Sequence, residues 1–289
     1  MPVLSETAKA KVNLTLRILG RRADGYHELE SLVAFADAGD VLRLEPGDGL
    51  EIDVSGPFAG SLGHHNLVVE AAKRIRAICP SCRVGRFLLE KNLPAAAGIG
   101  GGSADAASAL RLLLKANPEH LAQHDLTAIC PQLGADVAVC LDQRFAVMWG
   151  IGEKVSALGP LPETQVVLVN PGVALSTSNV FRALDAASYD GPDREIPDDL
   201  PPTFDTVKAL GSYLESRGND LEEAAIGLAP VVGDVRALLS AQAGCLIARM
   251  SGSGATCFGI FESEALAQQA ADRIGSAQPQ WWVVASKLA

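Results

Sequence analysis

The chain has 289 residues, a formal net charge of −10 at pH 7, and hydrophobic residues at 48% of its positions. A chain of this length and composition can bury a large core and build one large or two medium domains. The negative charge disfavours nucleic acid as a partner, because binding duplex or single strands depends on neutralising phosphates with Lys and Arg. No apolar run approaches the roughly 18 residues of a membrane span, and the N-terminus has no hydrophobic signal region. We therefore expect a cytoplasmic protein that partners neither nucleic acid nor a membrane.

Positive charge is concentrated near the N-terminus. One stretch holds five basic residues opposed only by Glu6: Lys9, Lys11, Arg17, Arg21 and Arg22. An acidic protein that handles anionic substrates must gather its positive charge in this way.

The six cysteines predict buried thiols in a reducing compartment. Cys79 and Cys82 form the one closely spaced pair. A zinc site would need a second pair of ligands at matching spacing, and a redox pair would begin a helix rather than follow one.

Residues 11–18 alternate between polar and apolar, which predicts a half-buried strand. Lys11 and Asn13 then point the same way, roughly 7 Å apart. An exposed polar face also explains this pattern. Next, an Asp-Gly turn places Tyr26 and His27 at a strand junction. Such a pair can stack on a flat ring and hydrogen-bond its edge, although a half-buried aromatic residue and a surface histidine would look the same.

The following elements lead to a glycine-rich loop. Short strands are expected at 29–35, 41–45 and 51–54, broken at 38–40 and 46–49. Asn66 is a good N-cap for a helix over 67–78, which Pro80 ends. An apolar strand at 87–89 then runs into the loop.

The loop carries the strongest chemical signal in the chain. It consists of small and apolar residues, namely Pro94, Ala95, Ala96, Ala97, Gly98, Ile99, Gly100, Gly101, Gly102, Ser103 and Ala104. A helical pattern follows, with apolar side chains at 106, 107, 110, 113 and 114. Glycines let several N–H groups turn toward one ligand, and the unpaired N–H groups of a helix start attract phosphate.

Three familiar phosphate-binding motifs do not fit the loop. No lysine follows the glycines as in a Walker A loop, and Ser103 stands where the dinucleotide fingerprint has a third glycine or alanine. The His-Arg-Asp and Asp-Phe-Gly motifs of protein kinases are absent. A glycine-rich turn without chemical meaning is the remaining alternative.

Asp136 lies among small and apolar residues after a helix expected at 119–133. Burying a lone charge costs several kcal/mol, so this carboxylate needs a cation, and Lys11 is the candidate. An Asp–Lys pair suits phosphoryl transfer to an alcohol, because the carboxylate accepts the hydroxyl proton and the ammonium offsets developing charge. A helix N-cap explains Asp136 equally well.

The second half mixes helices with antiparallel strands, which predicts an α+β domain after a boundary near residue 158. Ser176 and Thr177 can cap a helix at 178–184. An acidic loop at 189–205 has no assigned chemistry, and residues 251–254 form a small-residue turn or hairpin loop. Strands are expected at 144–149, 153–155, 166–169, 246–250, 256–261 and 282–285. Helices are expected at 207–216, 220–227, 232–242 and 264–274.

The glycine loop resembles the nucleotide loop of the galactokinase, homoserine kinase, mevalonate kinase and phosphomevalonate kinase (GHMP) superfamily. Four further blocks resemble, in the same order, the branch that acts on a cytidyl diphosphate derivative of methylerythritol in the non-mevalonate isoprenoid pathway. These blocks are 10–14, 21–28, 134–137 and 249–256.

The resemblance implies a fold and a reaction. The fold is α+β with two domains: a ribosomal-protein-S5-domain-2-like α/β domain at 1–158 and a ferredoxin-like α+β domain at 159–289. The reaction is ATP-dependent phosphorylation of the C2 hydroxyl of 4-diphosphocytidyl-2-C-methyl-D-erythritol. A sister kinase of the superfamily and a non-catalytic ATP-binding sensor are the alternatives. The protein would be a monomer or a weak homodimer with a small-molecule substrate.

The resemblance also implies roles for the residues singled out above. Asp136 would be the base and Lys11 its partner. Tyr26 and His27 would hold the cytosine. The other assigned positions are Asn13 and Thr177 in the substrate site, Asn66 near the adenine, and the loop from Pro94 to Ala104 around the ATP phosphates. Mg²⁺ is expected because it neutralises triphosphate charge, with no protein ligand assigned. Ala104 departs from the family pattern, which often has a second serine there.

Overall fold

The computed structural model describes residues 2–61, 66–122, 124–197 and 199–289, and the chain forms two compact units. Unit 1 comprises the residues up to Ala10, Gly39–Ala95 and Gly100–Gln143. Unit 2 comprises Lys11–Ala38, Ala96–Ile99 and Arg144–Ala289. Each unit is therefore discontinuous in sequence, and the segment 1–158 contributes to both. The predicted domain boundary near residue 158 stays a prediction.

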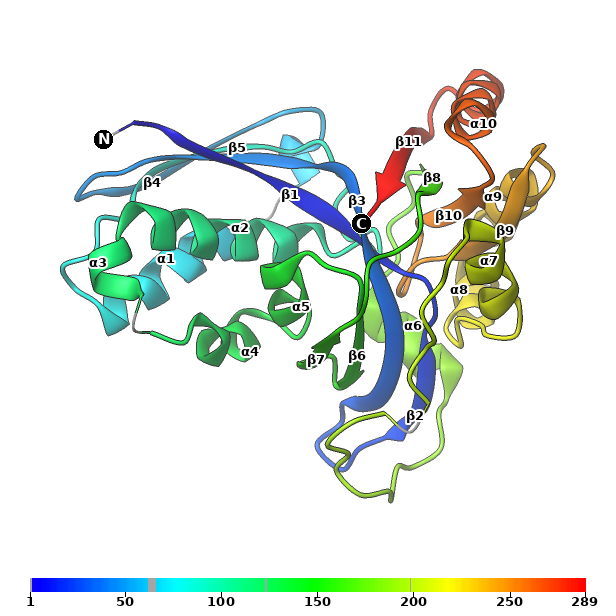
Figure 1. The fold of residues 1–289 in the computed structure, drawn as a ribbon, viewed down its shortest axis with the longest axis horizontal. Coiled ribbons are helices and arrows are strands. Elements are labelled where there is room, and N and C mark those ends of the chain that lie inside the picture. Colours follow the sequence, from blue (N-terminus) through cyan, green and yellow to red (C-terminus); the bar gives the residue numbers. More distant parts are fainter. Residues whose placement is uncertain (1, 62–65, 123, 198) are drawn as a thin grey trace. The chain divides into compact units, whose positions relative to one another are not determined.

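Unit 1 is a sheet with helices packed against it. Its strands follow the order β4-β5-β3, with β1 also paired to β3; β4 and β5 are parallel and α1 connects them. Helices α1 and α2 lie side by side (Figure 1). The strands that lie wholly or partly in unit 1 are β1 (Leu4–Asn13), β3 (His27–Glu45), β4 (Leu50–Ser55) and β5 (Gly85–Glu90); the end of β1 and the first part of β3 belong to unit 2. The α-helices are α1 (Leu67–Ile78), α2 (Gly101–Ala116), α3 (Pro118–Leu121), α4 (Cys130–Leu133) and α5 (Val137–Asp142).

Unit 2 contains an antiparallel sheet in the order β3-β11-β8-β10-β9, against which α9 and α10 pack. Taking β8, β9, β10 and β11 as strands one to four, with helices after the first and third, gives the βαββαβ arrangement of a ferredoxin-like fold. The sequence predicted this α+β architecture, and it is confirmed.

The remaining elements of unit 2 complete its strands and helices. The strands are β2 (Arg17–Arg21), β6 (Ala146–Gly150), β7 (Lys154–Ala157), β8 (Thr164–Asn170), β9 (Cys245–Met250), β10 (Cys257–Phe261) and β11 (Trp282–Leu288). The helices are α6 (Thr177–Leu184), α7 (Val207–Glu215), α8 (Glu222–Leu228), α9 (Val231–Ser240) and α10 (Glu264–Ala277). Strands β2 and β6 both pair with β3, and β7 pairs with β6.

The predicted break at 38–40 is wrong, because β3 runs unbroken through it. Glycine is typical of turns, but Gly39 lies within β3 at a point where the backbone of β1 comes very close. A Cβ on Gly39 would lie 2.4 Å from the carbonyl oxygen of Ala8. Only glycine lets the two backbones come so near.

Two further elements differ from their predictions. The strand expected at 11–18 is interrupted: β1 ends at Asn13 and β2 begins at Arg17. The helix expected at 119–133 is split into α3, a 3₁₀ turn at Leu126–Ile129, and α4. Asp125 causes part of the split, because its side chain accepts the Thr127 N–H at 2.9 Å and so caps a new turn.

Of the helices in the described part of the chain, none combines the length and apolar character needed to cross a membrane. All six cysteines are free thiols, and five of them are buried.

Candidate active site

In the glycine loop before α2, every second residue from Ala96 to Gly100 has a left-handed backbone conformation with positive φ. Ala96, Gly98 and Gly100 have φ of 49°, 74° and 64°. Gly100 stands at the N-cap of α2, and hydrogen bonding of the helix begins when the Ala104 N–H donates to the Gly100 carbonyl at 2.8 Å. The N–H groups of the first turn precede this bond and so have no partner within the helix. A helix start of this kind suits an anion, and phosphate binding at the loop stays a prediction.

Within unit 2, the middle of the loop packs against the turn at 251–254. The Ser251 hydroxyl donates to the Gly98 carbonyl at 3.0 Å and accepts the Asn13 N–H at 3.0 Å. A Cβ on Gly98 would lie 2.4 Å from the Ser251 carbonyl oxygen, so this position requires glycine. The buried Ser251 side chain therefore joins the end of β1, the glycine loop and the 251–254 turn. The sequence analysis predicted a small-residue turn here but gave no role to Ser251.

Asn13 presents an amide oxygen that accepts no hydrogen bond from any of the described residues. Its Nδ2 donates to the Ser31 hydroxyl at 2.7 Å, and Ser31 in turn donates its hydrogen to the Thr15 carbonyl. Since Ser31 has a single hydrogen, this network fixes the orientation of the Asn13 amide. Its Oδ1 is buried with no hydrogen-bond partner in the described residues, although Asn13 is only 3% exposed. Buried acceptors are rarely left unpaired, so this oxygen is suited to a donor on a ligand.

Tyr26 and His27 lie at the start of β3, as the Asp-Gly turn predicted. Tyr26 is 60% exposed. The His27 ring lies 4.7 Å from the ring of Phe181 in α6, centroid to centroid. Burial lowers the pKa of His27, and the charge of Arg21 adds to this effect. The imidazole is therefore neutral at pH 7, with one nitrogen able to donate and the other to accept. The sequence analysis did not select Phe181, an aromatic residue of the helix that follows Thr177.

The other predicted site residues are divided between the two units, and each has identified surroundings there. In unit 2, the Thr177 hydroxyl lies 2.8 Å from the Ser253 hydroxyl, and the Lys11 N–H donates to the Ile99 carbonyl at 2.9 Å. In unit 1, the Asn66 side chain accepts the Val68 N–H at 2.9 Å and caps α1. Asp136 stands at the N-cap position of α5, but its side chain makes no capping hydrogen bond. Asp136 therefore occupies the N-cap position that the alternative gave it, but its side chain does not bond the helix N–H groups.

A buried charge cluster lies at the start of α2 in unit 1. The Lys91 ammonium pairs with Asp40 and, at 2.7 Å, with Asp105, and all three residues are at most 3% exposed. Burial raises the pKa of Asp105 to about 7; the ammonium opposes this rise and the charge of Asp40 adds to it. Residues 40, 91 and 105 are far apart in sequence and match no motif, so sequence reasoning missed the cluster.

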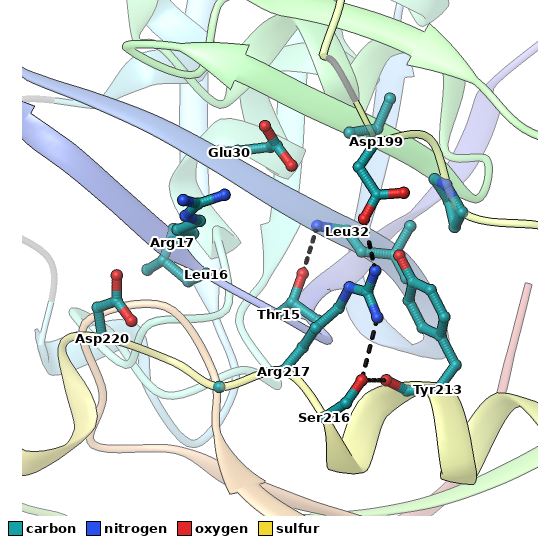
Figure 2. A pocket seen from close by; sticks show the side chains of 13 residues that line it. Thr15, Leu16, Arg17, Glu30, Leu32, Asp199, Tyr213, Ser216, Arg217 and Asp220 are labelled. Atoms are coloured by element: carbon teal, nitrogen blue, oxygen red, sulfur yellow. Dashed lines mark hydrogen bonds and ion pairs between the residues drawn. The ribbon is translucent and has the colours of Figure 1, made fainter.

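Unit 2 contains a cavity of about 460 Å³ between β3, α7 and the segment 199–201. Figure 2 shows the side chains that line it. Arg217 forms an ion pair with Asp199 at 2.7 Å and lies 3.7 Å over the ring of Tyr213. None of the predicted site residues lines the cavity. Glu30 and Leu32 face it, and because side chains alternate along a strand, the cavity lies on the face of β3 opposite to Ser31.

Acidic and thiol side chains do not converge on a metal in the part of the chain that the structure describes. No group of three or more His, Cys, Asp or Glu residues there is arranged to hold an ion.

Models of known protein families match two parts of the chain. Residues 66–148 match the family of GHMP kinase N-terminal domains, and residues 205–280 match GHMP kinases C terminal. A 4-diphosphocytidyl-2-C-methyl-D-erythritol kinase of Methylorubrum extorquens is 50% identical over 295 aligned residues that cover all of both chains. The chain belongs to this kinase family. A second family member, from Parvibaculum lavamentivorans, is 49% identical and covers 98% of this chain and 97% of its own.

Two solved structures are similar to the structure of this chain. The crystal structure of a 4-(cytidine 5'-diphospho)-2C-methyl-D-erythritol kinase has a TM-score of 0.77 and 35% identity, covering 99% of both chains. A homoserine kinase from Cytophaga hutchinsonii, with a TM-score of 0.68 and 18% identity over 99% of this chain and 95% of its own, shares the fold.

Proposed function

We propose that the protein transfers the γ-phosphoryl group of ATP to the C2 hydroxyl of 4-diphosphocytidyl-2-C-methyl-D-erythritol. The products are the 2-phosphate and ADP, in the non-mevalonate pathway to isoprenoid precursors. The observation that carries this proposal is 50% identity over the full length to a kinase named for that substrate. The loop and helix start described above supply the phosphate-binding backbone that such a reaction needs.

Asp136 and Lys11 carry the chemical step in this proposal. Asp136 accepts the proton of the C2 hydroxyl while the oxygen forms its bond to the γ-phosphorus and the bond to the β-phosphate oxygen breaks. Lys11 orients the hydroxyl and offsets the developing negative charge. Two observations support these roles: the Asp136 side chain forms no capping hydrogen bond with α5, and Lys11 is only 4% exposed, beside the glycine loop.

The substrate is held through groups that unit 2 already orients. The unpaired Oδ1 of Asn13 accepts a hydrogen bond from a substrate hydroxyl. The exposed Tyr26 ring offers a face for the cytosine, and the neutral His27 imidazole, held against Phe181, hydrogen-bonds its edge. Thr177 and Ser253 contribute a pair of hydroxyl groups.

ATP binds along the loop from Pro94 to Ala104, with its phosphates on the backbone N–H groups and Asn66 near the adenine. The donor set fits a Mg²⁺ that is held mainly by phosphate oxygens and water. Mg²⁺ commonly binds proteins in this way, and the described residues form no cage of carboxylates. The Ser103 hydroxyl is the remaining loop oxygen that could reach it, since Ala104 supplies none. Bound Mg²⁺ supplies neutralisation of triphosphate charge.

Product analysis tests the proposal. Substrate carrying ¹³C at the carbon that bears the methyl group is incubated with Mg·ATP and the protein, and the product is examined by ³¹P and ¹³C NMR. The proposal requires a new phosphomonoester whose phosphorus couples to the labelled carbon. A phosphate attached to another hydroxyl would refute the assignment of the C2 hydroxyl, and ATP binding without any product would favour a non-catalytic sensor.

A further inference from the structure

The buried cluster of Lys91, Asp40 and Asp105 connects the two ends of the glycine loop. Asp40 lies on β3, and its Oδ1 accepts the N–H groups of Asn92 at 2.6 Å and Leu93 at 2.8 Å, directly before the loop begins. Its Oδ2 pairs with the Lys91 ammonium. Asp40 therefore fixes the backbone that enters the loop.

The same ammonium holds the exit of the loop. Lys91 Nζ bonds Asp105 Oδ2, in the second turn of α2, at 2.7 Å. A Cβ on Gly101, the first residue of α2, would lie 3.7 Å from Lys91 Nζ and 3.8 Å from Asp40 Oδ2, so the cluster lies immediately beneath the helix start. Asp105 Oδ1 is buried with no hydrogen-bond partner among the residues described, so the carboxylate is held through its other oxygen.

Lys91 cannot itself bind a phosphate in this arrangement. The residue is 2% exposed, and its charge is shared between two carboxylates. Any effect that it has on a nucleotide must pass through the backbone that it holds. The N–H groups of Gly101, Gly102 and Ser103 can act on an anion only if the helix start is fixed relative to the loop entry.

We propose that Lys91 is a positioning residue for the nucleotide: together with Asp40 and Asp105 it fixes the entry and exit of the glycine loop relative to each other. The loop N–H groups then face the phosphates before ATP arrives, which removes an ordering cost from binding. This inference rests on the proposed function, since it takes the nucleotide to be the ligand of the loop. It concerns residues that no comparison with known proteins assigns.

Two variants and one control test the proposal. Lys91→Met removes the cation and leaves two buried carboxylates, so this variant can fail to fold. Asp105→Ala removes the connection to α2 but leaves a one-to-one pair of Lys91 and Asp40, and it is expected to fold. The control is Asn117→Ala at the other end of α2. Asn117 is buried and bonds the N–H and carbonyl of Arg83 and the carbonyl of Leu113, so its loss perturbs the same helix roughly 20 Å from the loop.

The measurements are the Kd for Mg·ADP by calorimetry and the KM for each substrate. Asp105→Ala, and Lys91→Met where it folds, should raise the Kd for Mg·ADP and the KM for ATP about 10- to 100-fold, because small misplacements of binding groups are costly. The KM for the alcohol substrate should stay within about twofold, and Asn117→Ala should leave all three constants within about twofold, as expected for distant sites.

The proposal is overturned if folded Asp105→Ala binds Mg·ADP with the affinity of the unaltered protein. It is also overturned if only kcat falls, because loss of folded protein lowers the active fraction without changing either KM. Failure of the proposed function is a separate result: the unaltered protein would not phosphorylate the cytidyl substrate, whatever the variants did to ADP affinity.

Discussion

Replacing Asp105 with Asn should change how the stability of the protein depends on pH. The folded protein raises the pKa of this carboxyl from an ordinary value of 3.8 to about 7, chiefly through burial. Between those two values the folded state binds a proton that the unfolded state has released, so the contribution of Asp105 to stability falls as pH rises. It is fully present below pH 3.8 and is lost as pH rises through about 7. The full shift corresponds to about 4 kcal/mol, and more than half of it is lost between pH 5 and pH 8.

Urea unfolding of the unaltered protein and of Asp105→Asn at several pH values between 5 and 8 measures this effect. The variant cannot ionise at position 105, so its free energy of unfolding should rise relative to that of the unaltered protein by about 2 to 3 kcal/mol from pH 5 to pH 8. Asp125→Asn is a control that should show no pH dependence over this range. Hydrogen bonds from Thr127 lower the pKa of Asp125 below its ordinary value of 3.8, so its contribution to stability is lost only as pH falls below that value. A difference between the two proteins that stays constant over this range would refute the assignment of a raised pKa to Asp105.

Three further substitutions have defined outcomes. Asp136→Asn should lower kcat about 10²- to 10⁴-fold while leaving the KM for ATP unchanged, because it removes the general base; unchanged turnover would show that Asp136 is not the base. Tyr26→Ala should raise the KM for the cytidyl substrate and not that for ATP, and equal losses of both would contradict stacking on the cytosine. Ser251→Ala leaves the Asn13 N–H and the Gly98 carbonyl unpaired and should cost about 2–4 kcal/mol in urea unfolding. A cost below about 1 kcal/mol would show that water replaces the hydroxyl.

Sequence patterns predicted the parts of the site that consist of contiguous residues. The glycine loop, the turn before Tyr26 and the N-cap at Asn66 are local features, and each lies in the predicted element or turn. Local chemistry determines such features, because capping and left-handed backbone depend on residues within one turn. The same local rules also misled: Ala38-Gly39-Asp40 has the composition of a turn, yet β3 continues through it because Gly39 allows β1 to approach.

Contacts between distant residues could not be predicted in this way. Lys91 lies 51 residues from Asp40 and 14 from Asp105, and Ser251 lies 153 residues from Gly98. The residues around each of these positions do not indicate which distant residue it contacts. These contacts follow from the packing of whole elements, and the hydrogen bonds that orient Asn13 become visible only once those elements are placed.

ADP release from Mg·ATP, measured across a panel of alcohols, tests the central claim most directly. The panel contains 4-diphosphocytidyl-2-C-methyl-D-erythritol, mevalonate, phosphomevalonate, homoserine and galactose. We expect turnover with the cytidyl compound alone. Turnover with another alcohol of the panel, and none with the cytidyl compound, would contradict the proposed substrate and the roles given to Tyr26 and His27. Binding of ATP without turnover of any alcohol would contradict the proposed catalytic function itself.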